Sequence, residues 1–274
     1  ALVQIDIDPH RIGRNYPVDV PLVGDAQRIL VELVYHFHRA LRDGERPASL
    51  WDEAPPPTRG HARYATPELR ESLAVPLTPQ RWRWELQEAL PDDVLLFSDI
   101  GGHMFFNIHE LCLRERQRFL INFGFASMGH GTAAPVGAAF ATDRPVVSIV
   151  GDACFTMNGM ELLTAVEHDL PVVWIVENNQ MHGIIWHGSQ LVGDRKPMEA
   201  VRYRRPLEIA AMARAMGLST WTVAQPNMIA GVLREALSRP GPALIEVRTD
   251  ASIAPPLGER AKSIAGFETE EEEG

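Results

Sequence analysis

Short apolar runs that alternate with helical patterns constrain the fold of this 274-residue chain most strongly. Largely apolar strands have no face for water, and helices between such strands are typical of a parallel sheet that is covered on both sides. We therefore expect an α/β, doubly wound domain with a mainly parallel sheet. The predicted strands are 94–98, 146–150, 172–176, 219–223 and 243–247, and the predicted helices are 79–90, 129–142, 158–169, 207–216 and 226–238.

The chain before this domain shows a strand pattern and an amphipathic helix. Residues 1–8 alternate between apolar and polar, and apolar residues recur at helical spacing between 25 and 42. Prolines crowd the following stretch, which indicates a linker. The predicted organisation is a partial α/β domain at 1–43, a proline-rich linker at 44–77, the main domain at 78–250 and an extended acidic tail at 251–274.

Composition argues against several classes of protein. The formal net charge is −10, which does not suit a nucleic-acid partner. No apolar run approaches the roughly 20 residues of a membrane-spanning helix, and the first residues do not form a signal peptide. Cys112 and Cys154 are too few for a disulfide framework. We expect a cytoplasmic protein that binds neither nucleic acid nor a membrane.

Polar or glycine-rich segments follow three predicted strands at their carboxyl ends. They are Asp99-Ile100-Gly101-Gly102-His103, Gly151-Asp152-Ala153-Cys154 and Glu177-Asn178-Asn179-Gln180. In open α/β sheets the ligand binds beyond the carboxyl ends of the strands, so all three segments are expected to face one crevice.

Two of these segments together suggest a cation and a phosphate. Asp152 and Asn179 end two strands that one crossover helix joins, and a carboxylate with an amide oxygen suits a hard cation such as Mg²⁺. The small residues Gly151 and Ala153, with a helix that begins near Asn158, would let backbone amides approach a phosphate. Either polar residue alone would be typical of a helix cap. Their spacing and placement together favour the binding site.

At this point the sequence resembles a known family. Gly151-Asp152-Ala153 followed by Asn178-Asn179 looks like the thiamine diphosphate signature, with Ala153 at its second Gly position, as in some acetolactate synthases. Two further regions, 127–139 and 1–33, resemble the preceding parts of the acetolactate synthase and pyruvate decarboxylase superfamily. Their motifs are Ser127-Met128-Gly129-His130-Gly131, Pro135-Val136-Gly137-Ala138-Ala139, Ile5-Asp6-Ile7-Asp8-Pro9 and Val23-Gly24-Asp25-Ala26. Nearly the whole chain thus resembles the C-terminal half of such an enzyme, from the end of its middle domain through its diphosphate-binding domain.

The resemblance implies roles for the matching positions. Asp152, Asn179 and the carbonyl of Met181 would bind Mg²⁺, which bridges to the diphosphate of the cofactor. Met128 would prop the cofactor in its bent form, and the carbonyl of Ala126 would accept a hydrogen bond from the cofactor's 4′-amino group. The full expected cofactor-binding set is Gly102, His103, Ala126, Met128, Gly151, Ala153, Cys154, Gly183 and Ile184, with Met128 and Ala126 as catalytic residues. His182, at the expected mouth of the pocket, is a third catalytic candidate on its position alone.

The activity implied by the resemblance is that of a thiamine diphosphate-dependent 2-oxo acid decarboxylase or carboligase. The cofactor carries the chemistry, and an acyl unit passes to an acceptor through an enamine intermediate. The family's catalytic glutamate belongs to an N-terminal pyrimidine-binding domain, which this sequence lacks. The resemblance therefore implies a second chain or protomer in a homo- or hetero-oligomer. It leaves the donor acid, the acceptor and the binding of FAD open.

Several residues have two interpretations. His130 and His182 could move protons or be ordinary histidines, and Cys154 suits a small residue beside a diphosphate better than a nucleophile. Trp186 and His187 are expected to line the substrate channel, although the tryptophan of acetolactate synthase would fall nearer Gly188. The cluster of Arg202, Arg204 and Arg205 would steer an anionic substrate or form a solvated surface.

Two other functions stay possible at this point. One is a non-catalytic, regulatory homologue of the same family, against which the intact Asp152 and Asn179 speak. The other is a dinucleotide-binding oxidoreductase, which needs Gly-x-Gly-x-x-Gly at a strand-to-helix turn. No such motif follows 94–98 or 146–150.

Overall fold

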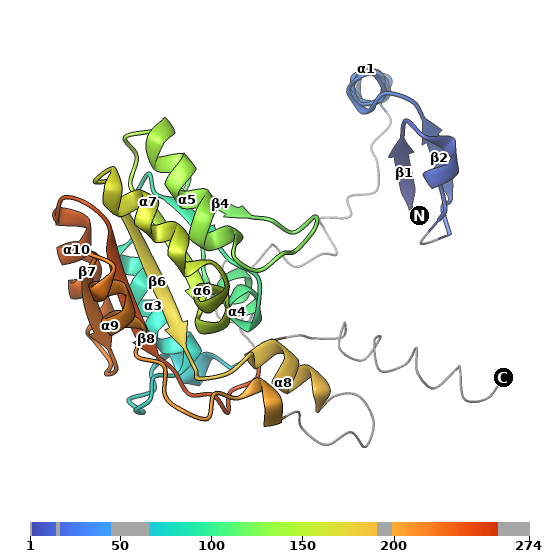
Figure 1. Ribbon diagram of the computed structural model, residues 1–274. Helices are drawn as coiled ribbons and strands as arrows, with labels where there is room; N and C mark the ends of the chain where they lie inside the picture. Colours follow the sequence, from blue (N-terminus) through green and yellow to red (C-terminus); the bar gives the residue numbers. More distant parts are fainter. Residues whose placement is uncertain (1, 15–16, 45–65, 191–198, 257–274) are drawn as a thin grey trace. The chain divides into compact units, whose positions relative to one another are not determined.

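The computed structural model (Figure 1) describes residues 2–14, 17–44, 66–190 and 199–256, and the chain divides into two compact units, Ala1–Arg59 and Gly60–Gly274. The smaller unit contains strands β1 (Val3–Asp6) and β2 (Val20–Val23), which pair in parallel, and helix α1 (Ala26–Arg42). Asp25 caps this helix, because its carboxylate accepts a hydrogen bond from the Arg28 amide at 3.0 Å. The strand and the helix predicted for this part are present, and β2 is an additional strand.

The larger unit is built on a six-stranded sheet in the order β4-β3-β5-β6-β8-β7, and every neighbouring pair is parallel. Its strands are β3 (Leu95–Ser98), β4 (Arg118–Ile121), β5 (Val146–Gly151), β6 (Val172–Asn178), β7 (Ser219–Val223) and β8 (Ala243–Arg248). All residues of β5 and β6 are buried, as their apolar sequences predict. The predicted α/β fold with a mainly parallel, doubly wound sheet is confirmed.

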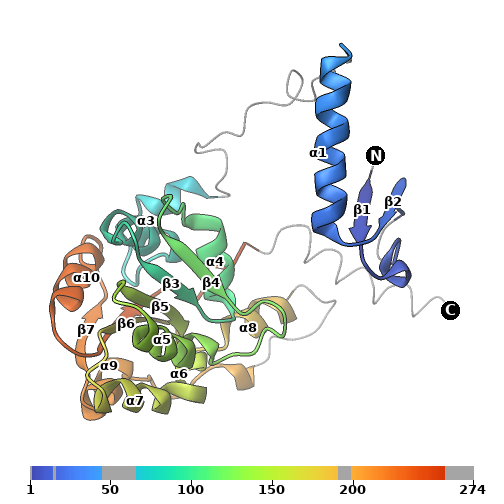
Figure 2. The same cartoon turned by 90° about the horizontal axis from the view of Figure 1, so that it is seen from above.

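Helices cover both faces of this sheet (Figure 2). Helices α3 (Pro79–Ala89) and α10 (Ile229–Ser238) pack on one face, where Trp82 and Leu233 are fully buried. Helices α5 (His130–Ala141), α7 (Leu162–Glu167) and α9 (Ile209–Ala215) pack on the other, around the buried Trp174. Three further helices lie beside the carboxyl ends of the central strands: α4 (Gly102–Glu110), α6 (Asp152–Asn158) and α8 (Gly183–Ser189).

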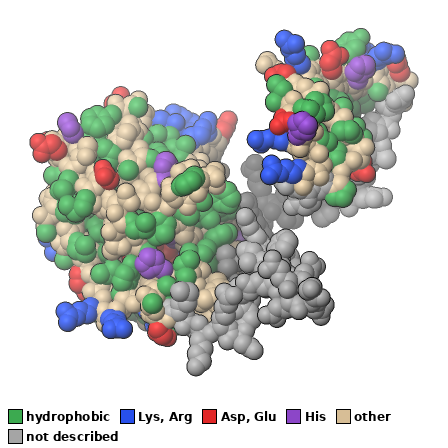
Figure 3. Space-filling model, turned by 45° about the vertical axis from the view of Figure 1, so that its right-hand side comes forward, with side chains coloured by type: hydrophobic (Ala, Val, Ile, Leu, Met, Phe, Trp, Pro, Cys, Tyr) green, Lys and Arg blue, Asp and Glu red, His purple; other side chains and the backbone are tan. Residues whose placement is uncertain are grey.

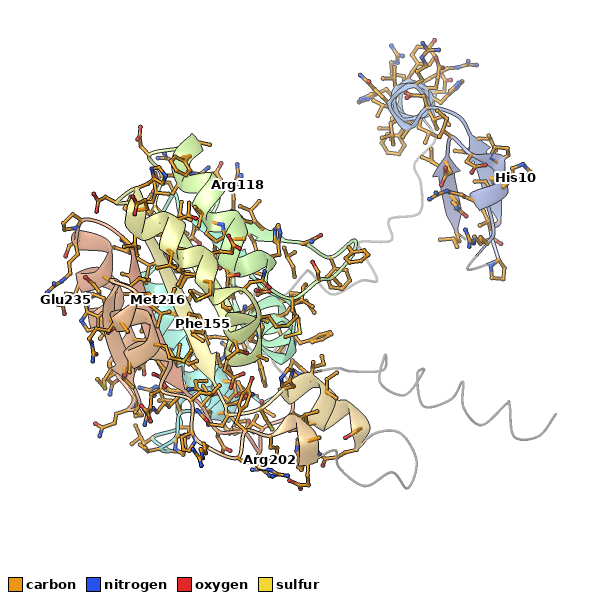
Figure 4. The ribbon with its side chains drawn as sticks, viewed as in Figure 1. His10, Arg118, Phe155, Arg202, Met216 and Glu235 are labelled. Carbon is orange, nitrogen blue, oxygen red and sulfur yellow. The ribbon has the colours of Figure 1, made fainter. Side chains whose placement is uncertain are left out.

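One predicted helix begins at the wrong residue. The helix expected over 158–169 starts at Asp152, directly after β5, and continues through a 3-10 turn at Gly159–Glu161 into α7. The early start carries Phe155 into the core on the α5 side of the sheet (Figure 4). The N-terminus of this helix therefore lies directly at the end of β5, at Asp152, rather than six residues later as predicted.

Part of the predicted linker packs on the larger unit. Pro67–Arg70 form a 3-10 turn, and the Leu77 amide donates to the carbonyl of Arg248 at 3.2 Å. Residues 45–65 of that linker and 257–274 of the predicted tail lie outside the described residues, and the boundaries at 44, 78 and 251 stay predictions. Among the described residues, we find no helix with the length and apolarity needed to cross a membrane.

Candidate functional site

A pocket lies where the carboxyl ends of β3, β5 and β6 meet the first turns of α4, α6 and α8. It brings together every metal, cofactor and catalytic residue predicted from the sequence except Ala126. These are Gly102, His103, Met128, Gly151, Asp152, Ala153, Cys154, Asn179, Met181, His182, Gly183 and Ile184.

Asp152 is the buried carboxylate of this pocket. It is 3% exposed, and its carboxylate accepts hydrogen bonds from the amides of Ala153 at 2.7 Å and Met181 at 3.3 Å. Burial raises the pKa of Asp152 to about 7, and the negative charge of Glu177 adds to that shift. Among the described residues, no lysine or arginine lines the pocket. A buried carboxylate in such a place favours a proton or a metal ion.

Asn179 comes next to Asp152 through a turn in the chain. Gln180 adopts a left-handed φ of 64°, so the backbone reverses just after β6. The Met181 amide then donates to the side-chain oxygen of Asn179 at 3.2 Å as well as to Asp152. Both side-chain oxygens accept a hydrogen bond from the same N–H group, so they lie close together. Carboxylate and amide oxygens are the metal ligands that Mg²⁺ prefers.

Asn178 faces the other way. Its amide nitrogen donates to the Glu246 carboxylate and the carbonyl of Leu207, both at 2.9 Å, so it fastens β6 to its surroundings. Within the described residues no group of three or more His, Cys, Asp or Glu side chains that could hold a metal ion occurs. A cation in the pocket would thus depend on amide or backbone oxygens beside Asp152.

The pocket wall is narrow around Gly151 and Gly102, and an unpaired ring nitrogen lies in the same part of the structure. A Cβ at Gly151 would lie 2.8 Å from Nδ1 of His103, and one at Gly102 would lie 3.7 Å from the Ile184 amide nitrogen. Burial, helped by the charge of Arg83, lowers the pKa of His103 to about 3, so its ring is neutral. Its Nε2 is buried and has no hydrogen-bond partner. In the tautomer with the proton on Nε2, this nitrogen could donate a hydrogen bond to a ligand oxygen without adding a charge.

Asp99 fixes the loop that carries Met128. Its carboxylate accepts hydrogen bonds from the amides of Gly129 and Gly131, at 3.0 and 3.1 Å. Burial raises the pKa of Asp99, and the bonds from Ile100, Gly129 and Gly131 oppose that shift. The sequence placed Asp99 at the crevice but assigned it no role.

Ala126 is the predicted site residue that the pocket does not include. It is exposed and adopts a left-handed φ of 58°, two residues before Met128. A non-glycine residue in this region stores backbone strain, which is common at functional sites. Its carbonyl role therefore stays a prediction.

The less specific candidates separate into two groups. His187 lines the pocket with His182, whereas Trp186 and His130 lie outside its wall. Trp186 of α8 instead packs under the guanidinium of Arg202, which lies 4.9 Å from the ring centre. Figure 4 labels Arg202.

Cys154 does not have the environment of a nucleophile. Its Sγ donates to the carbonyl of Ile100 at 3.1 Å. Burial raises the pKa of the Cys154 thiol well above its usual value, and the negative charge of Asp99 adds to this. A thiol that resists ionisation suits a small wall residue better than a catalytic one.

Sequence reasoning missed several residues. Asp250, Ile253 and Pro255 line the pocket although the last two fall in the predicted tail. Glu177, which the sequence placed at the crevice without a role, is also in the wall and forms a buried ion pair with Arg83 of α3. This ion pair was not predicted.

Comparison with known proteins identifies the family. The model of the thiamine pyrophosphate enzyme C-terminal TPP binding domain matches residues 99–247, more than half of the chain. The chain belongs to this family. The matched range begins at Asp99 and contains the whole set of predicted site residues, and thiamine pyrophosphate is another name for thiamine diphosphate. The family resemblance inferred from the sequence is confirmed, which removes the reason for a dinucleotide-binding alternative.

The chain is similar to acetolactate synthases over part of their length. It is 27% identical to the "Probable acetolactate synthase large subunit" of Methanococcus aeolicus, covering 92% of this chain and 43% of that protein. It is 30% identical to the acetolactate synthase of Arthrospira platensis, with 90% and 42% covered. The solved structure of a "putative thiamin diphosphate-dependent enzyme" from Mycobacterium smegmatis matches with a TM-score of 0.68 and 25% identity, over 91% of this chain and 44% of that one. The chain thus spans less than half the length of these relatives.

Proposed function

We propose that the pocket binds the diphosphate end of thiamine diphosphate through Mg²⁺ and forms part of an active site that decarboxylates a 2-oxo acid and transfers the acyl unit, as in acetolactate synthase. The observation that carries this proposal is the pair of Asp152 and Asn179 in a pocket that no lysine or arginine lines within the described residues.

Charge supports the need for a metal ion. The acidic side chains of Asp152 and Asp250 line the pocket, and Glu177 in its wall is already paired with Arg83, so within the described residues no positive side chain there faces a bare diphosphate. Mg²⁺ held by Asp152, Asn179 and the carbonyl of Met181 would neutralise negative charge on both the Asp152 carboxylate and the diphosphate. We therefore expect the pocket to bind diphosphate only together with Mg²⁺.

Backbone and imidazole groups would complete the diphosphate site. The small residues Gly102, Ala153, Cys154 and Gly183, with Ile184, would allow their amides to approach phosphate oxygens. Neutral His103, in the tautomer with its proton on Nε2, would donate one hydrogen bond to a phosphate oxygen. The narrow space around Gly151 supports this arrangement, because a side chain there would collide with His103.

The other end of the cofactor would lie toward Met128. Its loop is anchored by Asp99, so the side chain is held in the pocket wall and could prop the bent cofactor. The carbonyl of Ala126 would accept a hydrogen bond, and His182 would move a proton at the pocket mouth. Thiamine diphosphate, when bound, supplies the carbon that adds to the oxo group of the acid and takes up its electrons as carbon dioxide leaves.

We also propose that a pyrimidine-binding half, which carries the catalytic glutamate, completes the site from another chain or protomer. Large apolar side chains are exposed near the pocket loops and on the α5 side, including Phe125 at 88%, Phe140 at 59% and Met160 at 66%. Figure 3 shows hydrophobic side chains over one face of the larger unit with few charges among them. Exposed apolar surface of this kind suits a protein partner.

The test combines the chain with such an N-terminal polypeptide, Mg²⁺, thiamine diphosphate and pyruvate. Proton NMR follows deuterium exchange at C2 of the cofactor, and product analysis follows acetolactate. We expect fast exchange and product in the complex, and neither for the isolated chain or for a partner whose glutamate is replaced by glutamine. Fast exchange by the isolated chain would contradict the shared site. A complex that binds the cofactor without exchange would indicate a non-catalytic homologue.

A further inference from the structure

We propose that Arg83 is a positioning residue, whose buried guanidinium holds together the strand ends and the helix turn that form the diphosphate pocket. This inference rests on the proposed function, since it assigns the support of the same site. Nothing in the signature residues points to α3, the helix that carries Arg83.

The guanidinium of Arg83 is fully buried, with no exposed surface, and each of its nitrogens is used. Nη2 donates to the Glu177 carboxylate at 2.5 Å and to the carbonyl of His103 at 3.1 Å. Nε donates to the side-chain oxygen of Asn107 at 2.7 Å, and Nη1 to the carbonyl of Pro79 at 2.9 Å. One side chain thus joins α3, α4 and β6.

These contacts reach both strands beside β5. Asn107 donates to the Ser98 hydroxyl at 3.0 Å, and this hydroxyl donates to the carbonyl of Asp99 at 3.0 Å, at the end of β3. Glu177 stands opposite Gly151 in the β5–β6 register. Since β5 lies between β3 and β6 and presents Asp152, the network spans the proposed metal site from both sides.

Arg83 acts through its neighbours. Glu177 and His103 are in the pocket wall, and Arg83 is not. A buried ion pair is weak evidence for stability, because well-packed apolar residues in its place are often as stable or more so. The guanidinium group is planar and rigid, and it bonds both the His103 carbonyl and the Glu177 carboxylate. The role proposed for the ion pair is therefore to hold these two residues at a fixed separation.

A second buried ion pair provides a matched control. Arg70 donates to the Glu110 carboxylate at 2.9 Å, and the two side chains are 5% and 2% exposed. Arg70 also donates to the carbonyl of Glu110, so this pair grips the last residue of α4, whereas Arg83 grips its first turn. Neither Arg70 nor Glu110 lines the diphosphate pocket.

The experiment compares the double variants Arg83→Met/Glu177→Leu and Arg70→Met/Glu110→Leu with the single variant Arg83→Lys, all in the full 274-residue chain. Calorimetry measures the affinity for inorganic pyrophosphate with MgCl₂, and urea unfolding checks stability. We expect the Arg83 double variant to lose about 10- to 100-fold in affinity, the usual effect of removing groups that orient ligands. Arg83→Lys keeps the charge but not the fork, so it should lose affinity too. The Arg70 double variant should bind as wild type does.

Each other outcome has a definite meaning. Unchanged affinity in the Arg83 double variant, or in Arg83→Lys, would overturn the inference and leave the proposed function standing. Equal losses in both double variants would also overturn it, because general packing around α4 would then explain them. If the Arg83 double variant does not fold, Arg83→Lys decides alone. Failure of the wild-type chain to bind magnesium pyrophosphate would remove the proposed function and this inference with it.

Discussion

Replacing Asp152 by asparagine should make the metal-free protein more stable at alkaline pH while destroying the metal site. Burial holds the pKa of Asp152 at about 7 in the folded chain, against 3.8 for an ordinary aspartate. A carboxyl group whose pKa is raised by folding favours the folded state only while it is protonated. Its contribution is therefore full below about pH 4 and is lost as the pH rises through 7.

The size of the effect follows from this shift. Each pH unit between the unfolded and folded pKa changes the free energy of unfolding by about 1.4 kcal/mol. From pH 5 to pH 8 the wild-type chain should thus lose about 2 to 3 kcal/mol relative to Asp152→Asn, which does not titrate. The amide nitrogen of the new asparagine needs a hydrogen-bond acceptor. Burying it without one lowers the free energy of unfolding by about 1 to 3 kcal/mol at every pH. The pH slope is therefore a cleaner measure than stability at one pH.

The assay is urea unfolding at several pH values without metal, followed by tryptophan fluorescence. Trp82 and Trp174 are fully buried in the larger unit and report on it. Asp250→Asn serves as the matched control, because Asp250 also lines the pocket but is only partly buried. Parallel pH profiles for wild type and Asp152→Asn would refute the reasoning, as would a pH-dependent gain in Asp250→Asn of the same size.

Three further changes test other parts of the site. Asn179→Ala should abolish Mg²⁺-dependent binding of pyrophosphate in calorimetry, and wild-type affinity would contradict its role as a metal ligand. Met128→Ala should keep that affinity but lose about 100-fold in turnover of the assembled enzyme, since small displacements of reacting atoms have such effects; full activity would exclude the propping role. Gly131→Ala places a Cβ 2.7 Å from that of Asp99 and should reduce the free energy of unfolding by about 1 to 3 kcal/mol in urea. Gly137→Ala in the same helix meets nothing within 4 Å and is the control, with a gain of up to about 1 kcal/mol; equal effects would contradict the steric argument.

The central fold could be predicted because strands that are buried on both faces consist largely of apolar residues. Strands β5 and β6 are buried along their whole length and largely apolar, and they were predicted almost to their ends. The edge strand β4 has only four residues, and half of them are exposed, so its sequence does not form a long apolar run. Helix α4 was missed because its buried face includes His103, Asn107 and Glu110, which read as surface residues in a sequence.

The same contrast applies to the site. Asp152 and Asn179 could be found because the parallel sheet places the ends of neighbouring strands together. Arg83 could not, since it lies 94 residues from Glu177 and only the packing of α3 brings them together. Its position in an amphipathic helix gave no sign that its charge is buried.

The most direct test of the metal site is a crystal structure of the chain with thiamine diphosphate and Mn²⁺, whose anomalous scattering locates the ion. The account predicts one strong peak within bonding distance of the oxygens of Asp152, Asn179 and the carbonyl of Met181, with the diphosphate bound to the same ion and next to His103. A peak with other ligands, or a diphosphate held in this pocket without a metal ion at Asp152, would contradict it.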